Sequence, residues 1–243
     1  MQSFGDIRLI TPVGADAVIL YFNGESLDDA NAHCQRWLTL IKQELNAQNG
    51  GQTWLKECVP SYDSLMLVFD FEKIDTHGVY AHLVSLAKNA QAIEAQAAHQ
   101  CGDDIKTIPV WYGAPNASDF SVITKRTSLS IDEIIHLHTS SIFKVYAVGF
   151  APGFAYMGEV PEALACPRLT TPRKHVPKGA VAIADRQTAV YPSVSPGGWN
   201  LLGLSPIDMV RHMENKSESL LKAGDRVQFV SITEEEYNAY HEG

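Results

Sequence analysis

Glycine and proline are concentrated in one part of the chain, and this limits what that part can fold into. The 58 residues from Gly149 to Pro206 hold seven glycines and eight prolines, which together are more than half of the 29 glycines and prolines in the chain. Proline fixes φ and donates no hydrogen bond, and glycine favours turns, so long helices are excluded here. Short strands joined by tight turns remain, which is typical of a closed barrel or a sandwich.

Brief β-type runs alternate with these turns in the second half of the chain. A further apolar run at residues 106–112 precedes two short helices, and Ser130 and Glu133 form a capping-box pattern at the start of the second helix. We therefore expect a β-rich domain over residues 103–243. Its other predicted strands are residues 144–150, 180–184, 188–191 and 226–232.

The first part of the chain has a different pattern. Residues 17–22 form an apolar run, and Ser26 then precedes a stripe of apolar residues at helical spacing. Two more apolar runs follow at residues 53–59 and 65–71, and Thr76 is the predicted cap of a second helix. The pattern predicts a small α+β sandwich over residues 1–102, with two helices on one face of an antiparallel sheet.

Composition excludes several classes of partner. Acids outnumber bases by 28 to 19, for a net charge of −9, which argues against nucleic acid and anionic membranes as partners. The longest apolar runs are too short to span a bilayer, and the first 14 residues lack the pattern of a secretory leader. We expect a cytoplasmic protein whose four cysteines are reduced thiols.

Common catalytic motifs are missing. The sequence has no phosphate-binding P-loop, no nucleophile elbow, no zinc-protease helix motif and no dinucleotide fingerprint. His136 and His138 are two residues apart and diverge on a helix, so no metal site is predicted.

A basic cluster lies within the glycine- and proline-rich part. Five cationic or titratable residues fall within eleven positions, and no acid occurs between Glu162 and Asp185. Such a cluster can attract a carboxylate or a phosphate, although a solvated face and tight barrel corners are the simpler interpretation of the charges and turns. The cluster consists of Arg168, Arg173, Lys174, His175 and Lys178.

A series of spaced motifs resembles the allophanate hydrolase subunit 1 family. That family includes the B subunit of ATP-dependent 5-oxoprolinase, Kip-type inhibitors of a sporulation histidine kinase, and part of the carboxyltransferase region of urea carboxylase. The sequence departs from the family pattern at Ala180 and Leu204. The matching positions are residues 108–113, 137–138, 145–158, 167–168, 172–173, 176–177, 179, 187, 191–192, 195–199, 202–203 and 224–227.

The resemblance implies a cyclophilin-like β-barrel after the small α+β domain. It also implies a subunit 2 partner, a third lactam-processing subunit, ATP with magnesium shared with the partner, and a small lactam or carboxylate as substrate. It assigns no catalytic base or nucleophile.

On that basis, Arg168 and Arg173 are the candidate anion-binding residues. Gly197, Gly198 and Trp199 are expected to supply backbone N–H groups and an apolar wall, with Gln187 and Tyr191 as polar contacts. Further candidates are His138, His175 and Lys178.

Three other functions are alternatives to an enzyme subunit. One is a non-catalytic inhibitor of a sensor histidine kinase, as in the Kip-type relatives. Another is a prolyl isomerase, which follows from the barrel type alone, and a fold does not determine a function. The last is biotin-dependent carboxyl transfer, which requires a biotin carrier that this sequence lacks.

Overall fold

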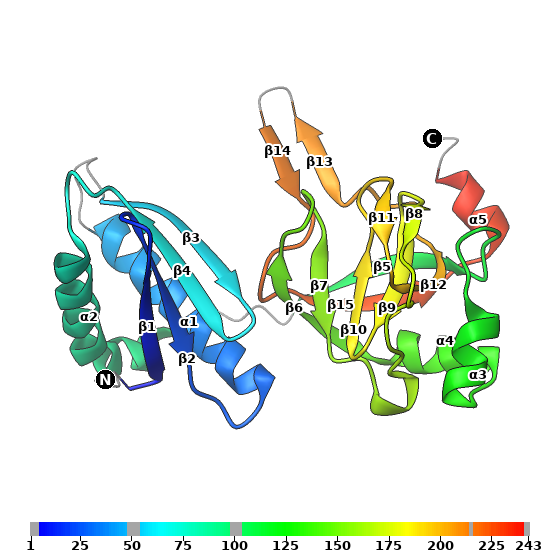
Figure 1. Cartoon of the computed structure of the whole chain (residues 1–243), viewed down its shortest axis with the longest axis horizontal. Coiled ribbons are helices and arrows are strands. Elements are labelled where there is room, and N and C mark those ends of the chain that lie inside the picture. The colour runs from blue at the N-terminus through cyan, green and yellow to red at the C-terminus, as the bar shows by residue number, and fades with distance from the viewer. Residues whose placement is uncertain (1–4, 48–53, 98–103, 214–215, 241–243) are drawn as a thin grey trace. The chain divides into compact units, whose positions relative to one another are not determined.

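The computed structural model describes residues 5–47, 54–97, 104–213 and 216–240. The chain divides into two compact units, Met1–Gly102 and Asp103–Gly243, and each is described by itself (Figure 1). The boundary predicted at residue 102 falls between residues 98 and 103, outside the described residues.

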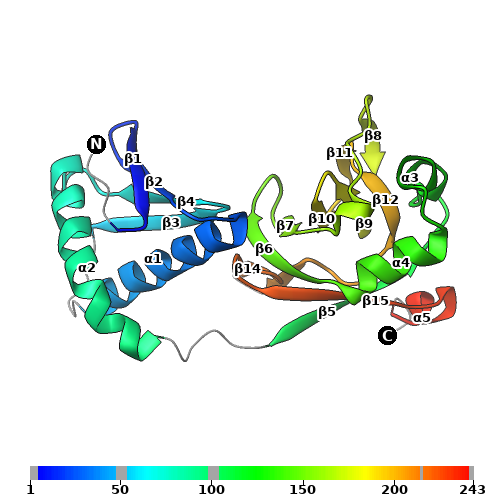
Figure 2. The ribbon, with the colours of Figure 1, turned by 90° about the horizontal axis from the view of Figure 1, so that it is seen from below.

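The first unit is an antiparallel sheet with the strand order β1-β2-β4-β3. Two long helices pack on one face of this sheet, so the predicted α+β sandwich is confirmed (Figure 2). In β4, Leu65, Leu67 and Phe69 point into the core, while Met66 and Val68 are half-buried on the other face. The elements are β1 (Ile7–Val13), β2 (Ala17–Phe22), α1 (Leu27–Ala47), β3 (Leu55–Ser61), β4 (Ser64–Phe69) and α2 (Thr76–Ala97).

The two helices of this unit begin differently from each other. Ser26 caps α1 as predicted, because its Oγ accepts a hydrogen bond from the Asp29 N–H at 3.1 Å. The prediction that Thr76 caps α2 is wrong. Asp75 takes that position, since its carboxylate accepts from the Gly78 N–H at 2.7 Å and Thr76 is already helical.

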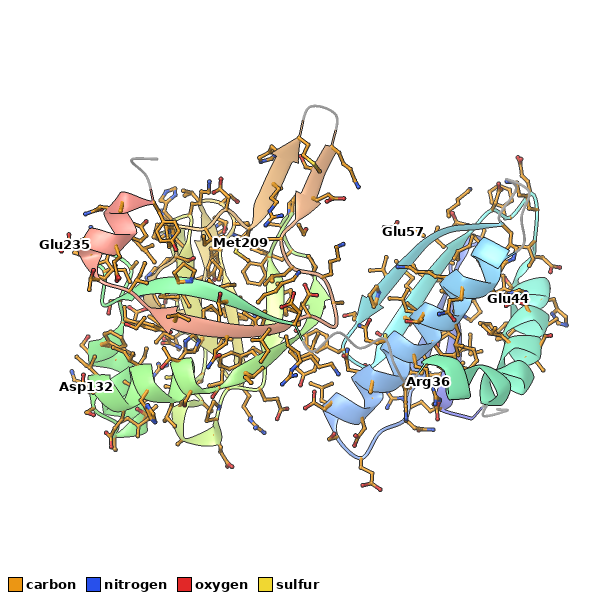
Figure 3. The ribbon with its side chains drawn as sticks, turned by 180° about the vertical axis from the view of Figure 1, so that it is seen from behind. Arg36, Glu44, Glu57, Asp132, Met209 and Glu235 are labelled. Carbon is orange, nitrogen blue, oxygen red and sulfur yellow. The ribbon has the colours of Figure 1, made fainter. Side chains whose placement is uncertain are left out.

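The side chains of this unit are drawn in Figure 3, which shows Arg36 and Glu44 on α1 and Glu57 on β3.

The second unit is a closed seven-stranded barrel, which confirms the barrel that the family resemblance implied and excludes the sandwich that the residue pattern had left open. Its strand order is β6-β15-β5-β12-β9-β10-β7, and the pairing of β6 with β7 closes it. The β15–β5 pair is parallel, and the other pairs are antiparallel. The barrel strands are β5 (Ile105–Tyr112), β6 (Ile142–Val148), β7 (Ala155–Gly158), β9 (Ala180–Ala184), β10 (Gln187–Val190), β12 (Asn200–Leu204) and β15 (Arg226–Ser231).

Smaller elements surround the barrel. Strands β8 and β11 form a two-stranded ribbon, and β13 and β14 form a second one (Figure 1). Helix α4 begins with the predicted capping box of Ser130 and Glu133, and α5 begins with another. These elements are α3 (Phe120–Thr127), α4 (Ile131–Ser140), the 3₁₀ turn η1 (Glu162–Leu164), β8 (Arg173–Val176), β11 (Ser195–Gly197), β13 (Val210–Met213), β14 (Lys216–Ser219) and α5 (Glu234–Ala239).

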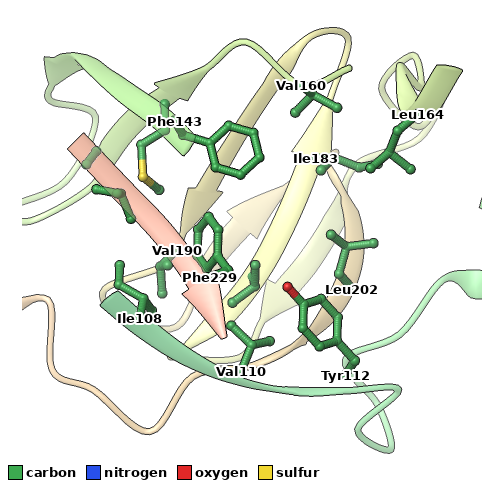
Figure 4. Close-up of a cluster of buried hydrophobic side chains, with 14 of the residues drawn as sticks. Ile108, Val110, Tyr112, Phe143, Val160, Leu164, Ile183, Val190, Leu202 and Phe229 are labelled. Carbon is green, nitrogen blue, oxygen red and sulfur yellow. The ribbon is translucent and has the colours of Figure 1, made fainter. Parts of the chain in front are cut away.

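The barrel has two apolar layers, one on each face of its wall. In β9, Val181 and Ile183 point into the barrel core, which also contains Phe143 and Phe229 (Figure 4). The alternate residues of β9 point outward and join a second cluster of buried side chains. The candidate site is built on this outer layer.

Candidate functional site

Alanines form the floor of the outer layer. Ala180, Ala182 and Ala184 alternate along β9, and Ala189 lies opposite Ala182 on β10. Because these side chains end at Cβ, large rings can approach the sheet closely. The departure from the family pattern at Ala180 therefore lies in this floor, where the residue is fully buried.

Four rings pack over this floor, and we call Phe154, Tyr156, Tyr191 and Trp199 the aromatic cluster. Phe154 is central, with ring-centroid distances of 4.8 Å to Tyr156, 5.3 Å to Tyr191 and 5.8 Å to Trp199. These contacts are edge-on, which is a favourable arrangement for aromatic pairs. Phe150 meets the edge of Phe154 at 5.3 Å and is itself 64% exposed.

Arg173 lies beside this cluster but is already neutralised. Its guanidinium forms an ion pair with Asp119, and its Nη1 donates to the Trp199 carbonyl at 3.2 Å. The second oxygen of Asp119 accepts from the Leu201 N–H at 2.6 Å. Arg173 therefore holds β8 and β12 to the start of α3 and has little charge left for a ligand.

Arg168 has a different environment. Its guanidinium lies over the Trp199 ring, with Cζ 5.8 Å from the ring centroid. Within the part of the chain that the structure describes, Arg168 has no acidic partner. It is the predicted anion-binding arginine whose charge is uncompensated.

The remaining basic residues do not join the aromatic cluster as free charges. Lys178 pairs with Asp208, and both side chains are more than half exposed. Lys174 and His175 are exposed on β8.

Tyr191 and Gly197 fit against each other. A Cβ on Gly197 would overlap the Tyr191 hydroxyl, so only glycine allows β11 to pass so close. Burial raises the pKa of the Tyr191 phenol, while the nearby charges of Arg168 and Arg173 and a hydrogen bond with the Trp199 backbone oppose that shift. The phenol is therefore neutral near pH 7.

Gly198 and Gln187 lie at different distances from the aromatic cluster. Gly198 follows β11, and its carbonyl accepts from the Leu169 N–H at 2.7 Å. Gln187 begins β10 opposite Ala184, about 13 Å along the strand from Tyr191. Gln187 thus lies at the margin of the outer face.

His138 is not part of this site. It is fully buried inside the barrel, on the opposite side of the wall from the aromatic cluster, and its ring stacks on Phe229 with centroids 4.4 Å apart. Its Nδ1 lies 2.6 Å from the Tyr112 hydroxyl and its Nε2 lies 2.9 Å from Thr188 Oγ1. Thr188 donates to the Ala182 carbonyl, so Nε2–H donates to Thr188 and Nδ1 accepts from Tyr112.

This burial predicts that stability depends on the charge of His138. Burial lowers the pKa of His138 from 6.5 to about 3, so below the ordinary value the unfolded chain binds a proton that the folded chain rejects. The stabilising contribution of the neutral His138 side chain to the free energy of unfolding is complete above about pH 6.5 and declines as the pH falls. We expect the free energy of unfolding to drop by about 1 kcal/mol from pH 7.5 to pH 5.5 through this group. Urea titrations of the wild type and of His138→Gln measure it, and equal pH slopes would contradict the assignment.

Sequence reasoning missed the residues that hold the basic loop in place. Asp119 pairs with Arg173 across 54 positions, and Asn200 Nδ2 donates to the Pro167 carbonyl at 2.9 Å. The one available signal was Asp119 itself, an acid directly before the apolar start of a helix.

The described residues contain neither a membrane-spanning helix nor a metal cluster. No helix among them is long and apolar enough to cross a membrane. No three histidine, cysteine, aspartate or glutamate residues come together there as metal ligands.

Comparison with known protein families identifies the family to which this chain belongs. The family described as the carboxyltransferase domain, subdomain C and D, matches residues 8–221. The chain belongs to this family. Both units lie largely within the matched range.

Named relatives in the family match over most of their length. The B subunit of the Bacillus subtilis 5-oxoprolinase is 38% identical over 191 residues, which are 76% of this chain and 79% of that protein. The B subunit of the Haemophilus influenzae 5-oxoprolinase is 32% identical over 221 residues, which are 91% of this chain and 96% of that protein.

A solved structure is similar across both units. The crystal structure of TTHA0988 superimposes with a TM-score of 0.72 at 33% identity. The match covers 90% of this chain but only 40% of TTHA0988. The fold seen here therefore also occurs as less than half of a longer polypeptide.

Proposed function

We propose that this chain is one subunit of a heteromeric, ATP-dependent 5-oxoprolinase that opens a lactam ring. The observation that carries the proposal is the match to two proteins named as the B subunit of 5-oxoprolinase, at 38% and 32% identity over most of each chain. Those names favour an enzyme subunit over the kinase-inhibitor alternative.

We further propose that a second polypeptide completes the site. The 40% coverage of TTHA0988 supports this, because the same fold is joined there to a longer stretch of chain. The partner would be the family's subunit 2, with a third lactam-processing subunit. The reduced thiols of Cys34, Cys58 and Cys166 are consistent with a complex that works in the cytoplasm.

ATP and magnesium do not fit the residues of this chain alone. The sequence has no phosphate-binding loop, the described residues bring no three histidines, cysteines or acids together as metal ligands, and Asp119 and Asp208 are paired with Arg173 and Lys178. We therefore propose that the partner subunit supplies most of the nucleotide site that the two subunits share. The role left to this chain is to bind and orient the lactam substrate against the aromatic cluster.

The test is reconstitution. We expect the full chain, co-expressed with a candidate second subunit and with the third protein added, to co-purify and to hydrolyse ATP only when 5-oxoproline is present. Omission of this chain is the control, and it is expected to abolish that dependence. A stable complex that hydrolyses no ATP with 5-oxoproline would contradict the proposed function.

A further inference from the structure

We propose that Arg168 and Trp199 form a subsite for a small monoanionic carboxylate on the outer face of the barrel. The choice of a lactam acid as the ligand rests on the proposed function. The preference for a carboxylate over a phosphate rests on charges and contacts of this chain.

Charge pairing decides how many cations the subsite offers. Of the two arginines beside the aromatic cluster, Arg173 is neutralised by Asp119, while Arg168 has no acid partner among the described residues. Lys178 is paired with Asp208 at an exposed position. Within the described part of the chain, the guanidinium on the Trp199 ring is therefore unpaired and matches a monoanionic carboxylate, while the neighbouring Arg126 is turned to the Pro167 carbonyl, to which its Nη1 donates at 2.8 Å.

The backbone on both sides of Arg168 is fixed. The Pro167 carbonyl accepts from Arg126 Nη1 at 2.8 Å and from Asn200 Nδ2 at 2.9 Å. On the other side, the Leu169 N–H donates to Gly198 at 2.7 Å. The side chain therefore starts from a fixed point, and binding costs little further ordering of the loop.

The Trp199 ring lies on one side of the exposed Arg168 guanidinium, with Cζ 5.8 Å from the ring centroid. A carboxylate that accepts two parallel hydrogen bonds approaches a guanidinium in its own plane, so the ring leaves that approach open. Trp199 is 5% exposed and packs edge-on against Phe154, with ring centroids 5.8 Å apart, so its ring is enclosed by its neighbours. The exposed ring of Phe150, at the edge of Phe154, offers an apolar contact for the rest of the ligand.

Fluorescence of the full chain tests the subsite, because Trp199 lies directly under Arg168. The probes are 5-oxoproline, 2-pyrrolidinone (the same lactam without its carboxylate), cyclopentanecarboxylate and inorganic phosphate. We expect a saturable change with both carboxylates, none with 2-pyrrolidinone at the same concentration, and weaker binding of phosphate. Trp199→Phe is expected to remove the signal.

Matched variants assign the binding to one charge. Arg168→Gln is expected to weaken carboxylate binding about tenfold or more, because a charged two-point contact is lost. Lys174→Gln removes the same charge from an exposed position on β8 and is expected to bind like the wild type. Circular dichroism checks that both variants are folded.

The outcomes separate the subsite from the proposed function. If cyclopentanecarboxylate binds through Arg168 and 5-oxoproline does not, the subsite stands and the 5-oxoprolinase proposal is contradicted. If Arg168→Gln binds 5-oxoproline like the wild type, if phosphate binds more tightly than the carboxylates, or if no carboxylate binds, the subsite is overturned. In those cases reconstitution still tests the enzyme proposal.

Discussion

His138→Ala is expected to lower the free energy of unfolding by about 4 kcal/mol at pH 7.5. The substitution opens a cavity beside Phe229, where the imidazole stacks at 4.4 Å, and it leaves the buried hydroxyl of Tyr112 without the acceptor 2.6 Å away. Burial already raises the pKa of Tyr112, so this phenol cannot ionise to relieve the loss. Urea denaturation followed by circular dichroism measures the effect.

His136→Ala is the matched control for this substitution. It removes the same side chain from an exposed position on α4, two residues earlier, and is expected to change stability by less than about 0.5 kcal/mol. His138→Gln keeps a polar group in the core and is expected to lose less than His138→Ala, so it remains measurable if the alanine variant does not fold. A loss below about 1 kcal/mol for His138→Ala would contradict a structural role in the barrel core.

Asp119→Ala is expected to cost about 2–3 kcal/mol of stability and to change which anions the outer face binds. It leaves Arg173 without its acid and the Leu201 N–H without the acceptor at 2.6 Å, in a site where the Asp119 side chain is only 12% exposed. The freed guanidinium adds a second cation beside Arg168. We therefore expect phosphate binding to increase in this variant.

Two comparisons isolate the cause. Asp208→Ala breaks the ion pair with Lys178, in which both side chains are more than half exposed, and is expected to cost less than about 1 kcal/mol. Asp119→Ala with Arg173→Met removes both charges and is expected to be more stable than Asp119→Ala alone. If the double variant is no more stable and phosphate binding is unchanged, the account of the Asp119–Arg173 pair is wrong.

The fold was predictable wherever one strand or helix had a regular apolar pattern of its own. The apolar runs at residues 17–22 and 180–184 predict strands, and both segments are strands in the structure. Strand β1 was missed because Leu9 and Ile10 are adjacent and Pro12 interrupts the run, which only an edge strand tolerates. Strands β8 and β11 were missed because each has only three or four residues and glycine or proline lies in or beside it.

The sequence predicted which residue types form the site but not which of its arginines form ion pairs with acids. The spacing of charges in residues 168–178 indicated a basic loop, and the loop does lie against Trp199 and Tyr191. Whether Arg173 or Arg168 is ion-paired depends on Asp119, which lies 54 positions before Arg173 in the sequence. A local pattern does not contain that information, because the contact forms only when α3 packs beside β12. His138 shows the same limit, since its burial follows from strands that are distant in sequence.

We propose that the outer face of the barrel binds the substrate of a 5-oxoprolinase complex, and the affinity of that complex for 5-oxoproline should then depend on Arg168. The measurement is the 5-oxoproline dependence of ATP hydrolysis by the reconstituted complex containing the wild-type, Arg168→Gln or Lys174→Gln chain. We expect a KM for 5-oxoproline about tenfold or more higher with Arg168→Gln and an unchanged KM with Lys174→Gln. An unchanged KM with Arg168→Gln, or ATP hydrolysis that does not depend on 5-oxoproline, would show that the substrate is not bound through this face.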